Sequence, residues 1–154
     1  MSQPPIDRRY AGRNVLTTMP RLKETLKSFY QWLAVAAEKC AADNVVIPAF
    51  EEGKLTSVAH PLGVFDVHED VSMVDDKLCI QIILFKPVSA LRKDALPFYV
   101  IRVHDDAVFF GPPASSAFEI DPNTGSWSHR NILQLGYELA LAATEPAQAI
   151  RIKV

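Results

Sequence analysis

The spacing of apolar residues changes twice along this chain, and this pattern constrains the fold more than any other feature of the sequence. Before Asn44, apolar residues recur at the spacing of one face of an α-helix. From Asn44 onwards they alternate residue by residue, as on one face of a β-strand. Helical spacing returns after Ser126, and Ala149 to Val154 alternate again. The sequence therefore predicts a helix, a run of strands, a second helix and a last strand.

The first predicted helix runs from Thr18, a suitable N-cap, to near Asp43. Pro20 then falls in the first turn, where the helix does not need its missing N–H. A helix of about 25 residues at ~1.5 Å per residue is ~37 Å long, whereas a strand of about eight residues spans ~27 Å. We therefore expect one end of this helix to overhang the sheet that it covers. Its apolar stripe consists of Leu22, Leu26, Phe29, Leu33, Ala36 or Ala37, and Cys40.

Residues 1–17 precede this helix and are predicted to form a flexible basic arm, because Arg8, Arg9 and Arg13 outnumber the acids there. A secretion or targeting leader is the alternative interpretation. Residues 18–154 are predicted to form a single domain, since a chain of 154 residues buries roughly 70% of its unfolded surface on folding. The content of 49% hydrophobic and 22% charged residues is that of an ordinary globular domain.

Turn signals divide the middle of the chain into hairpin-connected strands. The run from Lys77 to Phe85 is the most apolar, which predicts a central strand with both faces covered. Pro48 places the first strand at an edge or in a bulge, because proline lacks the N–H of a strand ladder. The predicted fold class is α+β: a mostly antiparallel twisted sheet of five to seven strands packed against two helices, in the order α-β(5-6)-α-β. The strands are expected at 45–50, 55–59, 64–74, 77–85, 98–104, 107–110 and 117–120.

The second predicted helix begins at Ser126 or Ser128 and ends near Glu145, before Pro146. A helix that is apolar on two sides is buried on two sides. We expect this one to lie between the sheet and the first helix, or between the sheet and another chain. One stripe holds Ile132, Leu135, Leu139 and Ala142, and the other holds Leu133, Tyr137, Ala140 and Leu141.

Charge and cysteine content argue against several functions. Sixteen basic and eighteen acidic residues give a net charge of -2, so nucleic acid is not an expected partner. No stretch approaches the ~20 apolar residues that cross a membrane. Cys40 and Cys79 fit neither a disulfide scaffold nor a zinc site, which predicts reduced thiols and a cytoplasmic protein. The sequence has no glycine-rich phosphate loop, and we expect no cofactor or metal.

His68 and His104 are the candidates for catalysis. Alternation places His68 on one strand face with Asp66 and Asp70, where an imidazole and a carboxylate form an acid/base pair or bind a divalent metal. Arg102 shares a face with His104 at the end of another strand. If both strands line one cavity, the chain is a small-molecule cavity protein or an enzyme of cystatin-like α+β type. The competing interpretation is a solvated polar surface, and we assign no catalytic residue.

The acidic stretch favours a different function. Between Asp66 and Asp76 the chain carries five acids and no base, which predicts an electrostatic patch that attracts a basic partner. We expect a non-enzymatic protein-binding module, such as an adaptor, an immunity-type protein or a chaperone-like protein. A structural subunit of a larger assembly or a homo-oligomer is the further alternative. The expected contacts are Asp66, Glu69, Asp70, Asp75 and Asp76, with Tyr30, Trp32 and Tyr137 as apolar anchors.

Overall fold

A computed structural model describes residues 5–39, 46–74, 77–86, 96–113, 116–120 and 129–145. The described residues form two helices and one seven-stranded sheet, which confirms the predicted α+β fold and its helix-first order. The last predicted strand, 149–154, lies outside the described residues. In chain order the elements are α1 (Pro5–Lys39), β1 (Ile47–Glu51), β2 (Lys54–His60), β3 (Gly63–Val74), β4 (Lys77–Lys86), β5 (Leu96–Val103), β6 (Val108–Gly111), β7 (Phe118–Ile120) and α2 (His129–Thr144).

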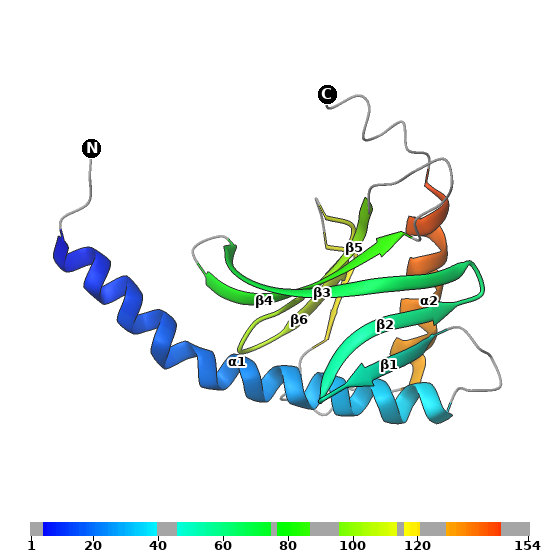
Figure 1. Ribbon diagram of the computed structural model, residues 1–154, viewed down its shortest axis with the longest axis horizontal. Coiled ribbons are helices and arrows are strands. Elements are labelled where there is room, and N and C mark those ends of the chain that lie inside the picture. Colours follow the sequence, from blue (N-terminus) through cyan, green and yellow to red (C-terminus); the bar gives the residue numbers. More distant parts are fainter. Residues whose placement is uncertain are drawn as a thin grey trace.

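The strands pair antiparallel in sequence order from β1 to β7, and the sheet curls over its length (Figure 1). Glu52 and Gly53 both have positive φ, at 52° and 79°, which suits the tight turn between β1 and β2. Strand β4 lies at the centre, as predicted, and Ile80, Ile82 and Leu84 on one of its faces are buried. The predicted cover on both faces is wrong for the described residues, because Gln81 and Ile83 on the other face are only half-buried and no described helix lies on that face. Edge strand β1 contains Pro48, in agreement with the sequence.

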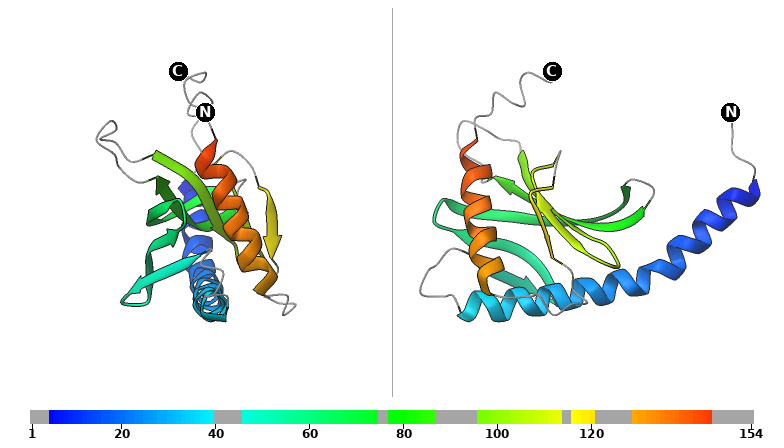
Figure 2. Two further views of the ribbon diagram at one scale, coloured as in Figure 1. Left: turned by 90° about the vertical axis from the view of Figure 1, so that its right-hand side faces the viewer. Right: turned by 180° about the vertical axis from the view of Figure 1, so that it is seen from behind.

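Both helices cover the same face of the sheet, which we call the inner face. Seen from behind, α2 lies in front of the sheet and α1 runs along its lower side (Figure 2). Phe29 of α1 meets Phe110 of β6 edge to face, with the ring centroids 5.8 Å apart. Ile132 and Leu139 of α2 are fully buried in the same core. The opposite face of the sheet, the outer face, has no described helix on it.

Helix α1 is longer than the sequence predicts. It begins at Pro5 rather than at Thr18, so residues 5–17 of the predicted arm are helical, and Pro20 lies inside the helix. The expected overhang is at the amino-terminal end, where α1 projects beyond the sheet and curves (Figure 1). Two local features account for the curvature. Pro20 donates no helical hydrogen bond, and the Thr17 hydroxyl donates to the Arg13 carbonyl oxygen at 3.1 Å.

Helix α2 is buried along one stripe rather than two. Ile132, Leu135, Leu139 and Ala142 are buried as expected, whereas Tyr137 and Leu141 of the second stripe are exposed. The His60 imidazole approaches the Gly136 carbonyl oxygen at 3.0 Å, so the glycine lies where α2 meets β2. Burial of the second stripe within this chain is therefore a wrong prediction for Tyr137 and Leu141.

Candidate functional site

The acidic residues of β3 are divided between the two faces of the sheet. Asp66, His68 and Asp70 are exposed on the outer face, as alternation predicts. Glu69 points to the inner face, where its carboxylate accepts a hydrogen bond from the Tyr30 hydroxyl at 2.6 Å. Asp75 and Asp76 lie outside the described residues. Among the described residues, the acidic patch on the outer face thus consists of Asp66 and Asp70.

Two of the three expected apolar anchors pack against their own chain. Tyr30 is buried, and burial together with the Glu69 carboxylate raises the pKa of its hydroxyl well above the usual range. Trp32 is half-buried, with its ring centroid 5.7 Å from that of Phe29. Tyr137 is 62% exposed and is available to a partner. Tyr30 and Glu69 therefore stabilise the contact of α1 with the sheet rather than a contact with another protein.

The two candidate catalytic histidines share the outer face but do not converge. His68 pairs with Ile83 of β4, and Ile83 pairs with Val100 of β5. His104 lies further along the chain from Val100, just beyond the end of β5. At ~3.3 Å per residue and ~4.8 Å per strand, the two histidine backbones lie roughly 16 Å apart. One substrate atom or metal ion cannot contact both imidazoles at that separation.

Arg102 and His104 both contact their own chain close to β6. The Arg102 guanidinium donates to the Pro113 carbonyl oxygen at 2.6 Å. His104 is buried, its backbone N–H donates to the Ala107 carbonyl oxygen at 2.9 Å, and its ring meets Phe109 edge to face. Burial lowers the pKa of the His104 imidazole. These contacts favour a structural role, in which a neutral His104 is packed inside the turn.

Cys79 is a buried free thiol on β4. Burial raises its pKa, although contact with the Ser72 hydroxyl acts in the opposite direction. A raised pKa keeps the sulfur protonated, and a protonated thiol is a poor nucleophile. Cys40 lies outside the described residues.

A groove lies where the overhanging end of α1 diverges from the sheet, and we call it the α1 groove. Its volume is about 820 Å³, and its two walls come from segments far apart in the sequence. One wall is the amino-terminal half of α1, and the other is formed by the start of β4, the end of β3 and the turn after β5. The lining residues are Arg8, Ala11, Gly12, Asn14, Val15, Thr18, Met73, Lys77, Leu78, Asp105 and Asp106.

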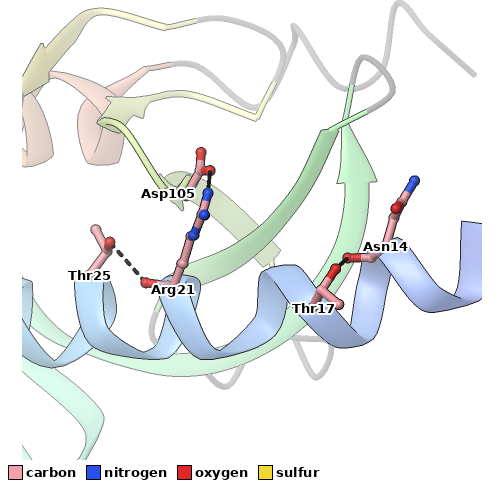
Figure 3. A network of polar contacts seen from close by, with 5 residues as sticks. All are labelled: Asn14, Thr17, Arg21, Thr25 and Asp105. Atoms are coloured by element: carbon pink, nitrogen blue, oxygen red, sulfur yellow. Dashed lines mark hydrogen bonds and ion pairs between the residues drawn. The ribbon is translucent and has the colours of Figure 1, made fainter.

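The α1 groove has apolar patches and charges of both signs. Ala11 and Val15 line the helix wall, and Met73 on the opposite wall is 57% exposed. The Arg21 guanidinium lies 4.0 Å from the Asp105 carboxylate and joins the two walls at one end (Figure 3). Arg8, Arg9 and Arg13 make no ion pair with any described residue. Both walls therefore offer apolar and charged side chains for which the described part of the chain supplies no partner.

Sequence reasoning missed this groove because it began the helix at Thr18. The signal was nonetheless present, since Ala11, Val15 and Thr18 continue the spacing of the stripe that includes Leu22. Pro20 suits the first turn of a helix as well as a bend inside one, so the sequence alone does not decide between a helical extension and an arm.

Comparisons with known proteins find no relative: no family model, no curated protein and no solved structure matches this chain. Among the described residues, no cluster of three or more His, Cys, Asp or Glu side chains is arranged to hold a metal ion. No described helix is long and apolar enough to cross a membrane.

Proposed function

We propose that this chain is a non-enzymatic protein-binding module and that the α1 groove is its binding site. The observation that carries the proposal is the overhang of α1. Residues 8–14 are exposed, although a helix normally buries one face against its own domain. A folded segment that extends beyond its own core and leaves an open groove behind it is suited to receive part of another protein.

The energetics of helices support this interpretation. A helix of fewer than ~12–15 residues is marginal in water without tertiary contacts, and a glycine inside a helix costs about 1 kcal/mol relative to alanine. The exposed half of α1 contains Gly12, and a Cβ at that position would meet nothing within 4 Å. Packing within this chain therefore does not require the glycine. Contact with a partner would supply the burial that the chain itself gives only to the later part of α1.

The lining of the α1 groove favours a protein over a small molecule. Small-molecule sites are mostly apolar cavities that enclose their ligand and contain a few polar groups. In this groove Ala11, Val15 and Leu78 lie among charges of both signs, with Arg8 on one wall and Asp106 on the other. An apolar centre with a charged rim is typical of protein interfaces.

The outer face of the sheet is a second surface that could serve the same function. Asp66 and Asp70 are exposed there and make no ion pair with any described residue. A basic partner would be attracted to these carboxylates. By contrast, the cavity-enzyme alternative has less support, because His68 and His104 lie on different strands and neither lines the α1 groove.

Selection from a phage-displayed library of random peptides tests the proposal. The full chain is immobilised at low density, so that each copy is isolated, and selected peptides are rescreened against Ala11→Trp, which fills the groove. Gln31→Trp, on the exposed side of the same helix, is the matched control. We expect peptides that bind the wild type and Gln31→Trp but not Ala11→Trp.

Two results would contradict the assignment of the groove. Peptides that bind Ala11→Trp as well as the wild type do not use the groove. Peptides that bind Ala11→Trp but are lost on the double variant Asp66→Lys/Asp70→Lys would move the binding site to the outer face.

A further inference from the structure

We infer that the occupant of the α1 groove is a second copy of this chain, and that two copies exchange the amino-terminal halves of their α1 helices across a two-fold axis. This inference rests on the proposed function, because it names the partner of the same site.

The overhang of α1 and the rim of the groove carry opposite charges. Arg8 lines the groove, Arg9 and Arg13 are exposed on the same overhang, and none of the three makes an ion pair with any described residue. The facing wall presents the exposed Asp105 and Asp106 beside Lys77. Unpaired arginines on the overhang and exposed aspartates at the rim fit a second copy, because each overhang can then contact the rim of the other molecule.

Within one copy, the helix geometry keeps these groups apart. Arg21 is the arginine that comes within ion-pair distance of Asp105, at 4.0 Å (Figure 3). Arg13 and Arg8 lie further towards the amino terminus, ~12 Å and ~20 Å from Arg21 along the helix axis at ~1.5 Å per residue. The overhang also curves beyond the end of the sheet (Figure 1). These arginines are therefore placed to contact the acidic rim of another molecule.

A two-fold axis satisfies both walls at once. In a dimer with this symmetry the same surface patch is used by both subunits, so the patch must be complementary to itself. A groove with a basic helix on one side and an acidic rim on the other meets this condition. The helix of each copy lies in the groove of the other, and each set of arginines faces the other copy's Asp105 and Asp106.

The centre of the groove provides apolar contacts for the two helices. Val15 and Met73 line the groove, and Leu16 on the same half of α1 is 75% exposed. Gly12 faces open space, since a Cβ there would meet nothing within 4 Å in its own chain. Two antiparallel helices can therefore approach closely at Gly12 and bury these apolar side chains between them.

Sedimentation equilibrium of the full chain over a wide concentration range tests the inference. One variant, Arg8→Glu/Arg9→Glu/Arg13→Glu, reverses the charge of the overhang. The other, Asp105→Lys/Asp106→Lys, reverses the rim. Lys23→Glu/Lys27→Glu/Lys39→Glu reverses three exposed lysines of the same helix outside the groove and is the matched control.

We expect the wild type and the control to approach twice the 17.1 kDa of one chain as concentration rises. Each groove variant alone faces like charge across the interface, and its dimer dissociation constant should rise about tenfold or more. Mixing the two variants should restore dimers at the wild-type concentration, because every reversed charge then meets an opposite one. Restoration also shows that both variants are folded.

The inference is overturned by a wild type that remains monomeric at every concentration, or by a mixture that dimerises no better than its components. A dimer that neither groove variant weakens also overturns it, because that interface lies elsewhere. If the dimer results overturn the inference but peptide binding still disappears in Ala11→Trp, the proposed function stands. A monomeric chain without groove-dependent peptide binding would contradict both.

Discussion

At the scale of single residues, the hydrogen bond of 2.6 Å from the Tyr30 hydroxyl to the Glu69 carboxylate joins helix α1 to strand β3. The sequence predicts that both residues contact a partner, because aromatic residues are enriched at interfaces and an acidic patch attracts a basic partner. In the structure they bond to each other across 39 residues of chain. Local sequence does not indicate which distant residue will face a side chain, so this pairing could not be predicted.

The Tyr30 hydroxyl bond should be measurable as stability. In Tyr30→Phe the half-buried Glu69 carboxylate loses its donor, and we expect the free energy of unfolding to fall by about 1–2 kcal/mol. Tyr99→Phe is the matched control, since the Tyr99 hydroxyl lies 3.5 Å from the Glu138 carboxylate and forms a weaker bond. Urea unfolding of the three proteins measures both changes. Equal losses of unfolding free energy in the two variants would show that the short bond of Tyr30 contributes no more stability than the long bond of Tyr99.

His104 should make the stability depend on pH. Burial lowers the pKa of its imidazole below the ordinary value of 6.5, and Lys77 and Arg102 act in the same direction, against Asp105 and Asp106. The folded state therefore binds the proton less tightly than the unfolded state. Stability is full above the ordinary value and is lost as the pH falls from there through the lowered pKa.

The corresponding variant is His104→Gln, which stays neutral across this range. Between about pH 7.5 and about pH 5 the wild type should lose more stability than His104→Gln, measured by urea unfolding at each pH. Parallel curves for the two proteins would show that His104 does not titrate differently on folding.

At the level of the elements, periodicity predicted most of the architecture and failed at one helix end. Apolar residues alternate along the strands because the inner face is buried. The spacing of Val58, Phe65 and Ile101 therefore predicts which side of each strand faces the core. The start of α1 depends on whether Pro20 begins a helix or bends one, and both positions are compatible with proline. The relation of His68 to His104 depends on the register of three strands, which local sequence does not determine.

Gly12 and Gly53 provide a test of the helical overhang. A Cβ at either position meets nothing within 4 Å, but Gly53 has φ of 79° whereas Gly12 lies within α1. Gly12→Ala should stabilise the overhang by about 1 kcal/mol, and Gly53→Ala should destabilise the β1–β2 turn by a similar amount. Amide hydrogen exchange at concentrations where the chain is monomeric would show slower exchange around residue 12. Unchanged exchange there would contradict a helical amino-terminal segment.

At the level of the whole molecule, the core and the α1 groove use different parts of the chain. The core begins at Leu22, the first fully buried side chain of α1, whereas the exposed range 8–14 contributes Arg8, Ala11, Gly12 and Asn14 to the groove. Folding and association are therefore separable. Ion pairs across an exposed rim are screened by salt, whereas buried apolar contacts are screened much less.

Removal of residues 1–17 tests this separation. The shortened chain keeps the residues from Leu22 onwards that pack the core, so its melting temperature should change by only a few degrees. It should remain monomeric at concentrations where the full chain dimerises, because it lacks Arg8, Arg9 and Arg13 and most of the helix wall. Sodium chloride should weaken the full-chain dimer and leave the shortened chain unaffected. A shortened chain that unfolds would place the overhang in the core, and one that still dimerises would place the interface on another surface.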